Sequence, residues 1–251
     1  MQIRMRHVVV VLFAALAVLL AGCGGGNGEE EAEAVEYEDG VYFAQADEFS
    51  PDSGWKDVVV IEVEDGEITS VEWNAAHRDN GTPKYERSRN GEYGMVERGD
   101  AMAPWYEQAD AVAQWLVESQ DPSALALDDE NRPEAISGAT IHSDGFKNLA
   151  QEALAAGPVG YGMYQDGSFS ATQDEFGENG WKPTVSVTVI GGRIVAAQWD
   201  DVNEDGESKT ELSTEGEYGM VENGGAMAPW YEQANATEAW LVENQDPGEL
   251  E

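Results

Sequence analysis

The sequence predicts an α+β fold that occurs twice along the chain. Each of the two tandem domains is expected to hold a small antiparallel sheet with helices on one side, and the second copy is expected to be incomplete. Three observations carry this prediction: the chain repeats itself with a long period, each copy opens with strand patterns, and helical patterns follow the strands. A length of 251 residues suits one or two domains of ordinary size.

The repeat is clearest in segments that are almost unchanged between the two copies. The offset in residue number between matching positions of the two copies falls from 127 to 126 to 125 along the chain, so two single-residue deletions separate the copies. A period this long indicates two domains and not a short-repeat solenoid. We expect domains at 39–155 and 166–251, joined by a linker at 156–165. The matching pairs include Asp39-Gly40-Val41-Tyr42 with Asp166-Gly167-Ser168-Phe169, Gly54-Trp55-Lys56 with Gly180-Trp181-Lys182, and residues 101–109 with 226–234.

Each copy begins with two apolar or alternating runs separated by a tight-turn dipeptide. In the first copy the runs are 58–63 and 68–73, around Asp65-Gly66. In the second they are 185–189 and 194–197, around Gly191-Gly192. Asp-Gly and Gly-Gly favour hairpin turns because both central positions accept positive φ. The sequence therefore predicts a β-hairpin at the start of each domain.

Two amphipathic helices follow in the first copy. The first starts near Pro104 and ends before Asp121-Pro122. The second is expected from about Ser143 to Ala156, where Gly157-Pro158 stops it. The apolar residues recur at helical spacing, so that each helix has one face for the sheet. These faces comprise Trp105, Ala109, Val112, Ala113 and Leu116, and then Phe146, Leu149, Ala150, Ala153 and Leu154.

Composition excludes several functions. Lys and Arg total 13 against 50 Asp and Glu, a formal net charge of −37, so the chain has too few cations to bind nucleic acid through phosphates. A hydrophobic content of 41% is enough for packed cores. The single Cys excludes a disulfide framework and a cysteine-based zinc or iron–sulfur site.

No metal site is expected. His77 and His142 are isolated in the sequence and lack the spacing of metal ligands. The Asp201-Val202-Asn203-Glu204-Asp205-Gly206 segment matches the first half of a calcium loop, but Leu212 stands where the closing acid belongs. This segment is therefore predicted to be a polar turn.

The first residues have the features of an export signal. Arg4 and Arg6 precede an unbroken apolar run at 8–21, which is too short for a confident membrane span. The run ends in Leu20-Ala21-Gly22-Cys23, which resembles a bacterial lipobox. We expect a lipoprotein signal peptide at 1–22, a lipid-modified Cys23, and a Gly/Glu-rich tether at 23–38 that lets the domains extend from a membrane surface.

Residues 133–143 form a turn of small residues that leads into the last predicted helix. Thr140 or Ser143 suits the N-cap. A helix N-terminus offers free N–H groups and the positive end of the dipole, which suit a phosphate. A capped helix that binds nothing is the simpler interpretation of these residues alone.

The Ser137-Gly138-Ala139-Thr140 sequence, with an acid at Glu134 and with Ser143 following, resembles the flavinylation motif of the FMN-binding domain family. The family includes the C subunit of sodium-pumping NADH:quinone reductase and the G subunit of the Rnf complex. Two-domain flavin lipoproteins of extracellular electron transfer are the members that this chain is most similar to. The family usually has Asp where this chain has Glu134.

The resemblance implies covalent FMN, joined through its phosphate to the Thr140 hydroxyl by a flavin transferase that works outside the cytoplasm. Ser137, Gly138, Ala139 and Ser143 are the further cofactor-binding residues that it implies. At an offset of 125 the second motif would fall at 262–265, beyond Glu251, so the second copy is expected to leave apolar sheet surface open. The aromatic residues Trp73, Trp105, Tyr106 and Trp115 could stack on a flavin, but their copies recur without the motif and predict core packing.

These observations together predict an electron-transfer flavoprotein, lipid-anchored on the extracytoplasmic face of the cell membrane. It would take electrons from a membrane NADH or quinol oxidoreductase and pass them to another carrier or an external acceptor. No catalytic residue is assigned, since the flavin supplies the redox chemistry. The alternative is a non-redox surface lipoprotein that uses the same fold as a ligand-binding or structural module.

Overall fold

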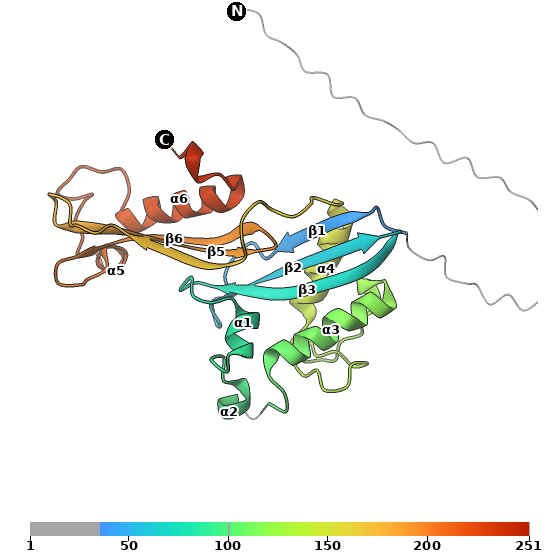
Figure 1. The fold of residues 1–251 in the computed structure, drawn as a ribbon. Helices are drawn as coiled ribbons and strands as arrows, with labels where there is room; N and C mark the ends of the chain where they lie inside the picture. Colours follow the sequence, from blue (N-terminus) through green and yellow to red (C-terminus); the bar gives the residue numbers. More distant parts are fainter. Residues whose placement is uncertain (1–35, 100, 251) are drawn as a thin grey trace, which may run out of the picture. The chain divides into compact units, whose positions relative to one another are not determined.

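The computed structural model describes residues 36–99 and 101–250. The predicted signal peptide and Cys23 lie outside the described residues. Two three-stranded antiparallel sheets are present, ordered β1-β2-β3 and β4-β5-β6 (Figure 1). Runs of β-branched residues such as those in β2 and β5 favour strands. The strands are β1 (Gly40–Gln45), β2 (Trp55–Glu64), β3 (Glu67–His77), β4 (Gly167–Thr172), β5 (Trp181–Ile190) and β6 (Arg193–Asn203).

Both predicted hairpins are confirmed. Asp65 and Gly66 have φ of 56° and 79°, and Gly191 and Gly192 have φ of 62° and 72°. These left-handed conformations match the twist of the strands that they join. The pairings of the two hairpins correspond, because Val59 pairs with Trp73 and Val185 pairs with Trp199. The two sheets are thus structural copies as well as sequence copies.

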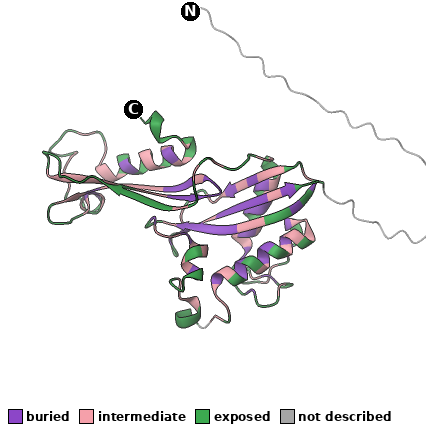
Figure 2. Cartoon of the chain, in the orientation of Figure 1, coloured by how far each residue is buried: buried purple, intermediate pink, exposed green. Residues whose placement is uncertain are grey.

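Helices cover one face of the first sheet (Figure 2), as predicted. The predicted face of α3 is fully buried, and α4 buries Phe146, Leu149, Ala150 and Ala153. The side-chain amide of Gln120, which follows α3, exchanges two hydrogen bonds with the backbone of Ile68 on β3. These bonds hold the end of α3 to the sheet. The helices of this repeat are α1 (Lys84–Arg89), α2 (Met95–Gly99), α3 (Trp105–Ser119) and α4 (Asp144–Ala156).

The second repeat lies against the opposite face of the first sheet. A cluster of buried aliphatic side chains joins the two, and Asn80 adds hydrogen bonds to the Thr188 side chain and the Ser186 carbonyl. The first sheet is therefore covered on both faces. The cluster consists of Val58, Val60 and Ala76 from the first sheet and Ile190, Val195 and Ala196 from the second.

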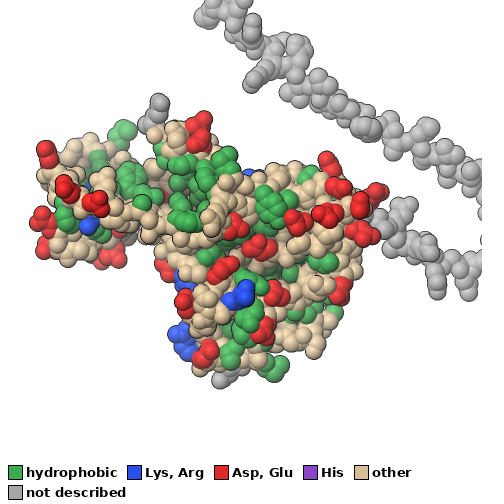
Figure 3. All heavy atoms as spheres, in the orientation of Figure 1, with side chains coloured by type: hydrophobic (Ala, Val, Ile, Leu, Met, Phe, Trp, Pro, Cys, Tyr) green, Lys and Arg blue, Asp and Glu red, His purple; other side chains and the backbone are tan. Residues whose placement is uncertain are grey.

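The second repeat continues with α5 (Lys209–Thr214) and α6 (Trp230–Asn244), and the described residues end without a counterpart of α4. Phe169 and Val185 are 46% and 39% exposed, whereas their counterparts Tyr42 and Val59 are 2% and 0% exposed. This agrees with the open apolar surface expected from the sequence. Hydrophobic side chains gather around α6 on the face shown in Figure 3.

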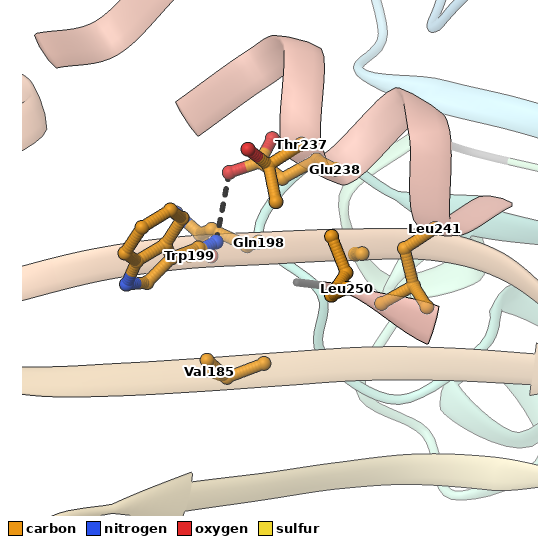
Figure 4. Close-up of a pocket in the computed structure, with 8 residues that line it drawn as sticks. Val185, Gln198, Trp199, Thr237, Glu238, Leu241 and Leu250 are labelled. Atoms are coloured by element: carbon orange, nitrogen blue, oxygen red, sulfur yellow. Dashed lines mark hydrogen bonds between the residues drawn. The ribbon is translucent and has the colours of Figure 1, made fainter. Parts of the chain in front are cut away.

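The exposed face forms a groove, which Figure 4 shows at close range. A cavity of about 420 Å³ lies between α6 and the second sheet. In the first repeat the equivalent space holds the apolar side of α4. The lining residues include Val185, Trp199, Leu241 and Leu250.

Candidate functional site

The motif loop runs from the end of the short 3₁₀ turn at Pro122–Ala124 to the first turn of α4. Ala139 and Ile141 are buried in the core, and the Ser143 N–H donates to the Asn131 carbonyl at 2.8 Å. Ser137 and Thr140, which lie next to these anchors, are exposed. Core packing therefore holds the loop and leaves these two residues facing solvent.

Gly138 makes the tight turn at the centre of the motif. Its φ is +87°, a conformation that L side chains rarely adopt, and apart from its two chain neighbours no residue has an atom within 4 Å of the position that a Cβ would take. The Ala139 N–H closes the turn on the Ile136 carbonyl at 3.2 Å. Glycine is needed here for the backbone conformation, and the space beside it is open to a ligand.

Thr140 is exposed but held in place by α3. Its N–H donates to Gln108 Oε1 at 2.7 Å, and its hydroxyl donates to the same oxygen at 3.2 Å. Gln108 is 2% exposed, and its Nε2 donates to the Ala103 carbonyl at 2.8 Å. A phosphoester at Thr140 would replace the hydroxyl bond, while the backbone bond to Gln108 would still position the residue.

Of the two N-cap candidates for α4, Ser143 is confirmed and Thr140 is not. Thr140 lies before the cap and bonds to Gln108. Ser143 occupies the N-cap position, but its hydroxyl donates to the Ile141 carbonyl at 3.1 Å and makes no bond to the helix. Because Ser143 is 0% exposed, it shapes the turn and does not face solvent.

Two half-buried charges, Asp57 and Lys84, lie near this corner of the fold. A Cβ at Gly145, in the first turn of α4, would stand 3.0 Å from Asp57 Oδ2. Burial raises the pKa of Asp57, and the nearby Lys84 charge opposes the rise. Burial lowers the pKa of Lys84, and Asp57 opposes the fall. The Lys84 ammonium lies 4.6 Å from the centre of the Trp105 ring.

Sequence reasoning missed Gln108, Asp57 and Lys84. The segment 101–109 was noted as an unchanged repeat, but identity between copies does not show which of its residues meets the motif. A lysine recurs at residues 84 and 209, which are equivalent positions at the repeat offset of 125. This recurrence is the feature of the sequence that could have singled out Lys84.

The other residues that the sequence singled out, the tryptophans, the acidic segment and the histidines, have structural roles or surroundings that can be described. Trp73 and Trp105 are each 3% exposed, and their rings meet edge to face at 5.3 Å, which confirms their core role. Asn203 Oδ1 accepts from two backbone N–H groups, which confirms the polar turn. His77 pairs with Asp79 at 2.9 Å. In residues 36–99 and 101–250, no group of three potential ligands gathers to hold a metal ion.

Comparison with known proteins decides the family. The model of the FMN-binding domain matches residues 54–155, which include the whole motif loop. Residues 54–155 belong to the FMN-binding domain family. This match supports FMN binding by the first repeat.

Individual relatives match parts of the chain. The 15 kDa lipoprotein of Treponema pallidum (strain Nichols) is 32% identical over 59 residues, which are 24% of this chain and 42% of that protein. The chain thus spans less than half the length of that relative. No helix in the described part of the chain is both long enough and apolar enough to cross a membrane.

Two solved structures are also similar to part of the chain. A solution NMR structure from Clostridium thermocellum shares 52% identity over 47% of this chain and 91% of that one, with a TM-score of 0.38. A crystal structure from Clostridium perfringens shares 26% identity over 48% of this chain and 88% of that one, also with a TM-score of 0.38.

Proposed function

We propose that this protein is an electron carrier that bears FMN covalently on Thr140. The observation that carries the proposal is the geometry of this threonine: its side chain is exposed, and Gln108 fixes its backbone beside the open turn at Gly138. The bond would be a phosphoester made by a flavin transferase, leaving the ring chemically unaltered. A covalent link makes cofactor retention intramolecular, which suits a protein that works outside the cell.

We further propose that Cys23 carries the lipid that anchors the chain to the extracytoplasmic face of the cell membrane. The lipobox-like sequence supports this, and so does the similarity to a treponemal lipoprotein. At that surface the flavin would receive electrons from a membrane NADH or quinol oxidoreductase and pass them to another carrier or an external acceptor. The resemblance of the repeated sequence to two-domain flavin lipoproteins of extracellular electron transfer supports this role.

The attachment site is tested by producing the chain together with a flavin transferase and FMN. Denatured protein on a gel should show flavin fluorescence, and Thr140→Ala should lose it. Ser137→Ala separates the attachment residue from its neighbour, because Ser137 is the nearest exposed hydroxyl of the motif and its loss should weaken labelling without abolishing it. Thr140→Ser should keep partial labelling. Fluorescence that persists in Thr140→Ala contradicts the assignment, and wild-type protein that is never labelled favours the non-redox lipoprotein instead.

A further inference from the structure

The groove of the second repeat is built from the same positions as the seat of α4 in the first repeat. It consists of two adjoining cavities of about 420 and 370 Å³, and Val185 and Leu241 line both. At the repeat offsets, its lining residues correspond to members of the core that α4 closes. The corresponding pairs are Phe169 with Tyr42, Val185 with Val59, Leu241 with Leu116 and Leu250 with Leu125.

The groove exposes apolar side chains that the first repeat covers. Phe169 and Leu250 are 46% and 44% exposed, whereas Tyr42 and Leu125 are 2% and 1% exposed. A contiguous apolar surface of this kind favours association with a segment that removes it from water. The first repeat shows directly which kind of segment has the right shape.

The segment that fits is an amphipathic helix. α4 has 13 residues, and its buried side chains recur at i, i+3, i+4 and i+7. The ring of Phe146 lies 5.1 Å from that of Trp73, whose equivalent Trp199 lines the groove. An occupant with an aromatic residue at the start of its apolar face can make the same contact. The buried residues of α4 are Phe146, Leu149, Ala150 and Ala153.

The groove differs from the seat of α4 in carrying an acid. Val112 and Ala113 of α3 are replaced on α6 by Thr237 and Glu238, and both line the groove (Figure 4). Glu238 Oε1 accepts the Trp199 N–H at 2.7 Å, and no ion pair within residues 36–99 and 101–250 includes this carboxylate. Burial is the main cause that raises the pKa of Glu238. A cation on the occupant would stabilise its charged form.

Basic side chains on the occupant have further partners. In the first repeat, Lys147 Nζ of α4 donates to the Leu125 carbonyl at 2.8 Å, and Leu250 holds the equivalent position at the groove. The chain as a whole carries a formal net charge of −37, which attracts a basic segment and repels an acidic one. Charge and shape therefore select the same kind of occupant.

A second copy of this chain fits the groove poorly. Phe146, Ala150 and Ala153 of α4 are each 0% exposed, so the helix of matching shape is already covered by its own sheet. Two chains that each carry a charge of −37 also repel one another. The occupant is better supplied by a different polypeptide.

We propose that the groove of the second repeat is a docking site for a basic amphipathic helix of another protein. The helix packs between α6 and the second sheet as α4 packs on the first sheet. Its apolar face covers Phe169, Val185 and Leu250, and a basic side chain pairs with Glu238. This binding does not depend on flavin in the first repeat.

The test uses a synthetic peptide with the sequence of residues 143–157, labelled for fluorescence anisotropy. A basic form carries Gln151→Lys and Glu152→Lys, two changes outside the buried face of α4. We expect both peptides to bind the full chain, the basic form about three- to tenfold more tightly, and Glu238→Gln to reduce this advantage. Val185→Gln should weaken binding at least about tenfold. Val221→Gln is the matched control, because Val221 is 37% exposed and lies outside the groove.

Several results would overturn the proposal. Equal affinities for Val185→Gln and Val221→Gln would place binding elsewhere, and an unaltered affinity of a Phe146→Gln peptide would show that charge alone drives it. A dimer of the chain in sedimentation that Val185→Gln dissociates would identify a second copy as the occupant. Binding of palmitate but not of either peptide would identify an acyl chain. Far-UV circular dichroism of the Val185→Gln chain checks that it remains folded.

Discussion

Val59 and Val185 are the same residue at equivalent positions, but only Val59 lies under a helix. Both stand on the central strand of their sheet, and each pairs with a tryptophan on the neighbouring strand. Val59 is 0% exposed in the core that α4 closes, whereas Val185 is 39% exposed in the groove of the second repeat. Truncating each to alanine therefore isolates the contribution of the covering helix.

The expected free-energy changes follow from this difference in burial. Val→Ala removes two methyl groups, a transfer cost of about 1.6 kcal/mol for a buried side chain, and the cavity left behind raises the total to about 2–3 kcal/mol. At Val185 part of the side chain is already in water and a cavity of about 420 Å³ already lies beside it. We expect a loss there of about 0.5 kcal/mol.

Thermal unfolding of the full chain measures both losses. For a compact unit of about 150–250 residues, about 2 kcal/mol corresponds to a fall in Tm of about 4–8 °C, so Val59→Ala should show a clear shift and Val185→Ala a much smaller one. Urea denaturation with unchanged slopes would confirm that the difference lies in the folded state. Equal losses at the two sites would show that the groove is filled in solution, and would refute the view that the second repeat has an open sheet face.

Three further results are expected. Cys23→Ser should move the protein from the membrane fraction to the soluble fraction, and unchanged fractionation would contradict lipid anchoring. Burial lowers the pKa of Lys56 from 10.5 to about 8, so the folded state binds fewer protons than the unfolded state between these values and stability should rise with pH across that interval. Lys56→Met should remove this rise and stabilise the protein at pH 7 by up to about 3 kcal/mol. Lys182→Met, at the half-buried counterpart, should change stability little. An unaltered pH dependence of stability in Lys56→Met would count against the lowered pKa of Lys56. Amide hydrogen exchange should be slower in 39–155 than in 166–251, and equal protection would mean that the α4 position is not needed to close the core.

Much of the fold could be predicted because local patterns agree with the tertiary structure. The Asp65-Gly66 and Gly191-Gly192 dipeptides specified their turns through positive φ, and the spacing of apolar residues specified the buried faces of α3 and α4. The internal repeat supplied the rest, since it showed which elements recur. The short helices α1 and α2 were missed because segments of five or six residues carry little periodicity.

The candidate site was predictable only in part. The motif pointed to Thr140, but its support comes from Gln108, which lies 32 residues earlier in the chain. The hydroxyl of Ser143 turned back to a carbonyl, and sequence alone does not distinguish that bond from a helix cap. Strand register places Ala75 opposite Asp57, a pairing that the sequence alone does not show.

The central claim is tested most directly by mass spectrometry of peptides from protein produced with a flavin transferase. The peptide that contains residues 133–143 should gain the mass of one FMN less one water, and fragmentation should place this mass on Thr140. Peptides from residues 166–251 should be unmodified. A flavin mass on Ser137, or on any peptide outside the motif, would contradict the account.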